Sequence, residues 1–319
     1  MNFKVVYKAL LLFSIIAALI AGVFMTVSLL HLSGDDGLNV FHADNGEYYK
    51  LVTWIFGVCM VMYVAAIAVL SKRIDKRLDF SGVPSRIAYG AMSFATLGLF
   101  GFCIGREAFA DGSYDLGNMY VVYTKEAFAN VQTTKVSYLY LLFLAVLVGS
   151  FAFFTYAFFA KVGEEGTNDN FAAFSMLPSI ALAVKIIYDF LLQSGHGYGA
   201  LYNFHLFGLG FALMFSVYET RFRFKKAAPA PYVFFGLISA LSTLIFSIPA
   251  LVLFFTGKAG ANWHPAFCAV DIVIVVYIYI RLFSLKVHLF ERQKKEQDIA
   301  FAFEGEEEEG ISAHGQSIE

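Results

Sequence analysis

Charged residues interrupt two otherwise apolar stretches of this sequence, and their types suit ligand binding or proton transfer. Lys185 and Asp189 fall within residues 171–193, and Asp271 falls within residues 264–283. A charge inside a bilayer costs about 2.5 kcal/mol or more, so such side chains usually face the interior of a helix bundle and pair with one another. Lys185 and Asp189 are four residues apart and therefore share one face of a helix.

Two more polar residues are expected at a similar depth. His205 and Asn203 follow shortly after the start of the next apolar stretch, and Lys185 is expected about 12 Å inward from the outer end of its helix at the usual helical rise. The sequence therefore predicts a charge-compensated cluster of Lys185, Asp189 and Asp271 in the outer half of the membrane. His205 and Asn203 are further candidates for this cluster, which could bind a small ligand or relay protons.

The same residues also admit a purely structural interpretation. Lys185 could pair with Asp189 within its own helix, with both side chains reaching toward the interface, while Asp271 takes part only in packing between helices. For His205 alone, a hydrogen bond between helices is the alternative to a ligand or relay role. No cofactor or metal site is indicated, because the sequence lacks the Walker A, H-E-x-x-H, G-x-S-x-G and c-type haem motifs.

Membrane-spanning helices must position these residues. The chain of 319 residues is 59% hydrophobic and 15% charged, with a mean hydropathy of +0.65, which lies outside the usual composition of soluble domains. A spanning helix needs about 20 apolar residues, and the strands of a barrel would alternate apolar and polar residues, which these stretches do not. The sequence therefore predicts an all-α polytopic bundle in residues 1–290. Its eight transmembrane helices are expected at about 5–31, 50–71, 85–105, 135–160, 171–193, 198–219, 231–256 and 264–285.

The distribution of Lys and Arg predicts the orientation of the bundle, because these residues concentrate in cytoplasmic loops. Of the 23 basic residues, 17 fall on one side of the predicted helices, five fall on the other, and Lys185 lies within a helix. Both termini are therefore expected in the cytoplasm, with the protein integral to the plasma membrane. In an alternative, the first apolar stretch is a cleaved signal peptide, but that stretch has the length of a spanning helix.

The polar ends of the predicted helices and the C-terminal segment carry weaker signals. Residues 291–319 combine a basic stretch with a run of glutamates, which predicts a disordered, acidic cytoplasmic tail that could dock a protein partner. Glu219 and Arg221, at the inner end of the sixth helix, are expected to pair at the surface. Cys103 and Cys268 are both expected near the outer face, so a disulfide between them is conceivable. No feature indicates nucleic-acid binding.

Short runs in the second half of the chain resemble a family of membrane proteins. These are KIIYDF from Lys185, then Asn203, then YETR from Tyr218, and finally Asp271 with YIRL from Tyr279. They are similar to the second half of uncharacterised multi-pass membrane proteins of Clostridia and related Gram-positive bacteria. The resemblance covers less than half of the chain and implies a bacterial plasma membrane, but no particular chemistry.

Three functions are consistent with these features. The first, which we favour, is the handling of a small solute or ion through the outer cluster. The second is a membrane sensor or assembly partner without catalysis, whose tail and basic loops contact cytoplasmic proteins. The third is a lipid-modifying enzyme that uses Asp271, Asp189 and His205 as acid and base groups. Because the standard catalytic motifs are missing, a role without catalysis is preferred.

Overall fold

The computed structural model describes residues 3–32, 47–76, 78, 80, 82–109, 138–159, 169–193, 200–256 and 265–287. Across these ranges the regular structure is helical, apart from one isolated bridge between Ile74 and Val287. The helices are α1 (Phe3–Leu32), α2 (Glu47–Leu70), α3 (Val83–Phe109), α5 (Tyr138–Phe159), α6 (Asp169–Phe174), α7 (Leu177–Gln193), α8 (Ala200–Arg223), α9 (Pro229–Phe255) and α10 (Pro265–Phe283). The chain is therefore an all-α helical bundle, as predicted.

The helices have the length and the surface of membrane-spanning segments. Among the described residues, seven helical segments are long and apolar enough to cross a bilayer: α1, α2, α3, α5, the segment Ala172–Phe190, α9 and α10. The eighth, α8, has 24 residues, which corresponds to about 36 Å of helix. Large apolar side chains face outward, with Phe94 80% exposed and Phe255 79% exposed. Lipid is the solvent that accepts such a surface, so the predicted all-α polytopic bundle is confirmed, with seven of its helices long and apolar enough to span a membrane.

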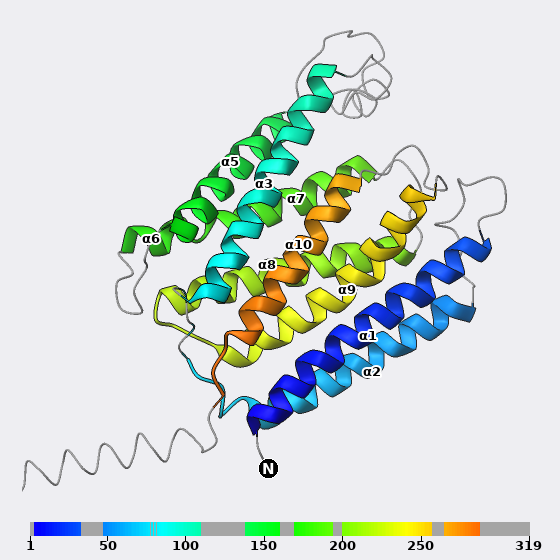
Figure 1. Cartoon of the computed structure of the whole chain (residues 1–319), viewed down its shortest axis with the longest axis vertical. Helices are drawn as coiled ribbons and strands as arrows, with labels where there is room; N and C mark the ends of the chain where they lie inside the picture. The colour runs from blue at the N-terminus through cyan, green and yellow to red at the C-terminus, as the bar shows by residue number, and fades with distance from the viewer. Residues whose placement is uncertain are drawn as a thin grey trace, which may run out of the picture.

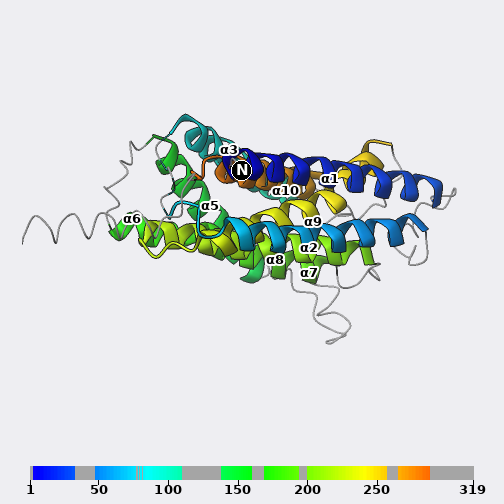
Figure 2. The same ribbon diagram turned by 90° about the horizontal axis from the view of Figure 1, so that it is seen from below.

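Helix α9 occupies the centre of the bundle. In Figure 1, α1 and α2 pair along one edge, α3 and α5 lie along the opposite edge, and α7 to α10 lie between them; Figure 2 gives the view from below. Small residues let α9 approach α8 closely, since a Cβ atom added at Gly208 would lie 2.8 Å from the backbone nitrogen of Thr243. The Ser239 hydroxyl donates a hydrogen bond of 2.9 Å to the Gly208 carbonyl. This is the packing of small residues expected between membrane helices.

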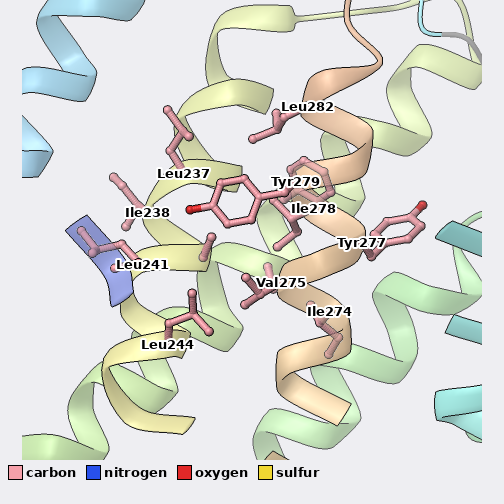
Figure 3. Packing of buried hydrophobic residues seen from close by; sticks show 14 of the residues in the cluster. Leu237, Ile238, Leu241, Leu244, Ile274, Val275, Tyr277, Ile278, Tyr279 and Leu282 are labelled. Carbon is pink, nitrogen blue, oxygen red and sulfur yellow. The ribbon is translucent and has the colours of Figure 1, made fainter. Parts of the chain in front are cut away.

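Helices α9 and α10 pack through branched apolar side chains. Figure 3 shows Leu237, Leu241 and Leu244 of α9 on one side and residues of α10 on the other. In the same view, Tyr279 points toward α9 while Tyr277 points to the opposite side of α10. The Tyr279 hydroxyl is hydrogen-bonded to the Ser14 hydroxyl of α1 at 3.0 Å, and the Tyr277 hydroxyl donates to Glu219 of α8 at 2.7 Å.

The sequence predicts one continuous helix over residues 171–193, and the structure differs by breaking it between α6 and α7. The break falls at Ser175 and Met176, just before Pro178. Proline has no N–H to donate to the carbonyl four residues earlier, so the helical ladder cannot continue unbroken through this position. The hydroxyl of Thr220 donates to the Ser175 carbonyl at 3.0 Å, which satisfies one of the acceptors at the break.

The first and last described helices begin and end at the same face of the bundle. The Tyr7 hydroxyl near the start of α1 donates to the Leu282 carbonyl near the end of α10 at 2.9 Å. The Asp75 backbone N–H, after α2, donates to the Lys286 carbonyl at 2.9 Å. An even number of crossings accounts for this placement. The predicted tail, 291–319, lies outside the described residues.

Candidate functional site

Four of the five candidate residues meet inside the bundle. Lys185 Nζ lies 2.6 Å from Asp189 Oδ2 and 3.0 Å from Asp271 Oδ1. His205 places Nε2 at 3.2 Å from Asp189 Oδ2 and Nδ1 at 3.5 Å from Asp271 Oδ2. The two carboxylates therefore alternate with the two basic groups in a closed ring, which we call the central cluster (Lys185, Asp189, His205 and Asp271).

Three helices supply the central cluster. Lys185 and Asp189 come from α7, His205 from α8 and Asp271 from α10. Every member is buried, and the Asp271 side chain has no exposed surface. The structural alternative, with Lys185 and Asp189 reaching toward the interface and Asp271 separate from them, does not describe this arrangement. Lys185 pairs both within its own helix and with Asp271.

His205 sets the charge of the central cluster. Each of its ring nitrogens faces a carboxylate oxygen, and only the protonated imidazole carries an N–H at both nitrogens. With His205 protonated, the cluster holds two positive and two negative charges. With His205 neutral, one negative charge of this buried cluster is left without compensation, which is costly. The cluster therefore places one imidazole between two carboxylates that come from different helices.

Asn203 is not part of the central cluster. Its side chain is exposed, whereas His205, two positions further along α8, is buried. Successive residues on a helix point in directions about 100° apart, so two positions place these side chains on different faces. Asn203 thus separates from the other four candidates despite its similar depth.

Three aromatic rings pack against one another beside the central cluster. The Phe143 and Tyr188 rings stack with centroids 4.7 Å apart, and Phe267 lies 6.2 Å from Tyr188. Lys185 Nζ lies 5.4 Å from the centroid of the Phe267 ring, within the range of a cation–π contact.

A cavity of about 70 Å³ lies beside Lys185 of the central cluster. Its walls come from α3, α5, α7, α8 and α10, and they are mostly apolar. Lys185 lines the cavity beside hydroxyl-bearing residues. These are Thr96, Ser150, Ser175, Ser216 and Thr220. Glu219, Arg223 and Tyr277 also line it.

Glu219 and Tyr277 belong to a second polar network, which was not predicted from the sequence. Glu219 Oε1 accepts hydrogen bonds from the Tyr277 hydroxyl at 2.7 Å and from Arg281 Nε at 3.0 Å. Arg281 Nη1 also donates to the Ser85 hydroxyl at 2.6 Å. We call these four residues the Glu219 network. Arg223 adjoins it, donating to the Tyr89 hydroxyl at 2.8 Å with its guanidinium 4.2 Å from the Phe80 ring.

The Glu219 network corrects the prediction that Glu219 pairs with Arg221 at the surface. Glu219 is 5% exposed and binds Arg281 of α10, while Arg221 is exposed and lies over the Tyr218 ring. The two residues do not pair because they are two positions apart on α8, so their side chains point to different faces of the helix. The sequence feature that could have indicated this network is the four-residue spacing of Tyr277 and Arg281, which places a hydroxyl and a guanidinium on one face of a helix.

Each of the three cysteines is a buried thiol. Cys103 and Cys268 are both buried and are not joined in a disulfide, so the conceivable pairing is not formed. Within the part of the chain that the structure describes, no group of three His, Cys, Asp or Glu residues has the geometry to hold a metal ion.

Comparison with known proteins adds no assignment. No protein-family model, no curated protein and no solved structure matches this chain. The site geometry is therefore the basis for a functional proposal.

Proposed function

We propose that this membrane protein handles a small ion or solute through the central cluster, and that the ion the cluster itself carries is the proton. The supporting observation is the position of His205 between Asp189 and Asp271. Histidine changes its protonation state most readily near neutral pH. A histidine held between two carboxylates from different helices can receive a proton from one side and release it to the other.

The burial of the central cluster supports a functional role over simple packing. A buried ion-pair network rarely adds stability beyond that of an apolar core of the same shape. Charged residues within membrane-spanning segments commonly mark ion or proton paths. The cavity beside Lys185 supports the same proposal. Its volume of about 70 Å³ restricts any accompanying solute to a few non-hydrogen atoms.

Proton uptake into lipid vesicles tests this proposal. The purified protein would be reconstituted in vesicles that contain a pH-sensitive dye, and a potassium gradient with valinomycin would impose a membrane potential. We expect proton uptake by the wild type, and uptake lower by about tenfold or more in Asp271→Asn and His205→Gln, because each removes a proton-exchanging group. Asn203→Ala, which changes an exposed residue of the same helix, is the matched control.

The possible results of the uptake experiment have different meanings. Uptake by the wild type no faster than in protein-free vesicles would contradict the proposed function. Uptake by both cluster variants at the wild-type rate would show that protons move elsewhere. Elution of each variant as a single species in size-exclusion chromatography would establish that a slow rate reflects lost chemistry rather than lost folding.

We further propose that the protein lies in a bacterial plasma membrane with both termini in the cytoplasm. The excess of Lys and Arg on one side supports this orientation. Two of the 17 residues on that side, Arg223 and Arg281, are buried and act in networks rather than in loops, but the asymmetry persists without them. A reporter fused after Arg292 is expected to be active only in its cytoplasmic form, and activity of an external reporter there would overturn the orientation.

A further inference from the structure

The cavity beside Lys185 also reaches a second carboxylate, that of Glu219. Both hydrogen bonds to Glu219 end on Oε1, and Oε2 accepts none from the residues that the structure describes. Glu219 lines the cavity. A buried carboxylate oxygen beside a cavity is expected to be satisfied by water.

The distance between the central cluster and Glu219 is too long for direct proton transfer. Ser179 of α7 and Ser216 of α8 are hydrogen-bonded at 2.9 Å and mark a common level on these antiparallel helices. Lys185 lies six residues beyond that level on α7, and Glu219 lies three residues beyond it in the opposite direction on α8. At the helical rise, these offsets are about 9 Å and about 4.5 Å, which gives an axial separation of about 13 Å.

Water can bridge this separation within the observed cavity. Hydrogen-bonded oxygens are about 2.8 Å apart, and a cavity of about 70 Å³ has room for two to five waters. The hydroxyls of Thr96, Ser150 and Ser216 line the same space. The Thr96 and Ser150 hydroxyls donate to backbone carbonyls, and the Ser216 hydroxyl pairs with Ser179. Each hydroxyl oxygen can still accept a hydrogen bond from water and so orient a short chain of waters.

We infer that waters in this cavity connect the central cluster to Glu219, and that Glu219 is the second proton-exchanging group of the protein. This inference rests on the proposed function. A hydronium ion that reaches Glu219 gives its proton to Oε2 and becomes water, while the carboxylate becomes a carboxylic acid. Tyr277 and Arg281 hold Oε1 throughout, so Oε2 remains directed at the cavity. The reverse step returns the proton to the chain of waters.

The lining of the cavity gives this path a direction. On α8 the lining residues run from Ala212 to Arg223, all on the C-terminal side of His205, and on α7 they run from Pro178 to Lys185, all on the N-terminal side of Asp189. In this conformation, the central cluster therefore exchanges protons with the Glu219 side of the membrane. That side carries the exposed Lys225 and Lys226 just beyond α8.

Radiolytic labelling of the wild-type protein tests for the waters without any substitution. A brief X-ray pulse makes hydroxyl radicals from water, including internal water, and these label adjacent side chains. Met92 and Tyr277 are buried and line the cavity, whereas Met25 and Tyr232 are buried elsewhere. We expect labelling of Met92 and Tyr277 to exceed that of Met25 and Tyr232 several-fold. Equal labelling of the two pairs would show a dry cavity and overturn the inference.

Vesicle proton uptake tests the role of Glu219. Glu219→Gln keeps an oxygen acceptor for Tyr277 and Arg281 but removes the exchangeable proton, and Asp75→Asn makes the same change outside the cavity. Ala212→Leu fills the cavity, and Ala269→Leu adds the same volume at an exposed position of α10. We expect several-fold slower uptake in Glu219→Gln and in Ala212→Leu, and wild-type rates in the two controls.

These measurements distinguish the inference from the proposed function on which it rests. Wild-type uptake that is lost in Asp271→Asn but unchanged in both Glu219→Gln and Ala212→Leu would overturn the water path alone. No uptake by the wild type would overturn the proposed function. In that case, labelled cavity waters would be structural, and the proton role of Glu219 would fall as well.

Discussion

Arg281 of α10 and Glu219 of α8 form an ion pair in which Arg281 Nε lies 3.0 Å from Glu219 Oε1, and the Arg281 side chain has no exposed surface. The pair joins two helices through groups that neither helix could bury alone. The same guanidinium reaches Ser85 of α3, so one side chain ties three helices together near one end of the bundle.

Removing one partner of this pair should be strongly destabilising. We expect Arg281→Gln to lower the free energy of unfolding by about 3–5 kcal/mol, because Glu219 is left as an uncompensated buried charge. The measurement is thermal or denaturant unfolding in detergent. Arg221→Gln, at an exposed position of α8, is the control and should stay within about 0.5 kcal/mol of the wild type. Equal stability of the two variants would refute the structural role of the pair.

The central cluster should show strong coupling between its charges. Lys185→Met leaves two carboxylates facing each other across His205, so we expect a large loss of stability from this change alone. Adding Asp189→Asn removes one of those charges. The double variant should therefore be more stable than the sum of the two single changes indicates, by about 0.5–3 kcal/mol, as in a double-mutant cycle of contacting residues. Additive effects would contradict the ring of contacts.

Gly208 should tolerate no side chain. A Cβ atom there would meet the backbone of Thr243 at 2.8 Å, and backbone atoms cannot move aside as a side chain can. We expect Gly208→Ala to force α8 and α9 apart and to cost about 1–3 kcal/mol, as overpacking does. Gly210→Ala is the matched control, because nothing lies within 4 Å of the added atom. Both variants are compared by unfolding midpoint, and similar midpoints would argue against the close contact.

A charged residue on the exposed apolar surface should be unfavourable, because this surface faces lipid. Phe94 is 80% exposed and lies in α3, so Phe94→Lys should make insertion of this helix less favourable by about 2.5–3.5 kcal/mol. Insertion can be measured with glycosylation sites that flank the helix. Phe94→Leu keeps the position apolar and should insert like the wild type. Unchanged insertion of Phe94→Lys would indicate that this face meets water or protein.

Much of the fold could be predicted from the sequence because spanning helices require long apolar stretches. The central cluster was also accessible to sequence reasoning, since Lys185, Asp189 and Asp271 are charges within such stretches and must find partners inside the bundle. Asn203 could not be excluded, because depth along a helix does not specify which face a residue occupies until the neighbouring helices are placed.

The Glu219 network could not be predicted for a related reason. Glu219 and Arg281 lie near helix ends, where charged side chains usually meet the interface, so their types carry no signal of burial. Their burial depends on how α3 brings Ser85 and Tyr89 against α8 and α10. The break between α6 and α7 was missed because Pro178 can kink a membrane helix without ending it, and composition does not separate the two outcomes.

The division of the central cluster among helices has a consequence for biosynthesis. Helix α7 carries both Lys185 and Asp189, four residues apart, so its charges compensate each other as soon as that segment is made. Within α10, Asp271 has no Lys, Arg or His to accompany it other than Arg281, ten positions later. Its entry into the membrane is therefore helped by a lysine that was inserted earlier, and the order of synthesis from α7 to α10 supplies the cation before the carboxylate that needs it.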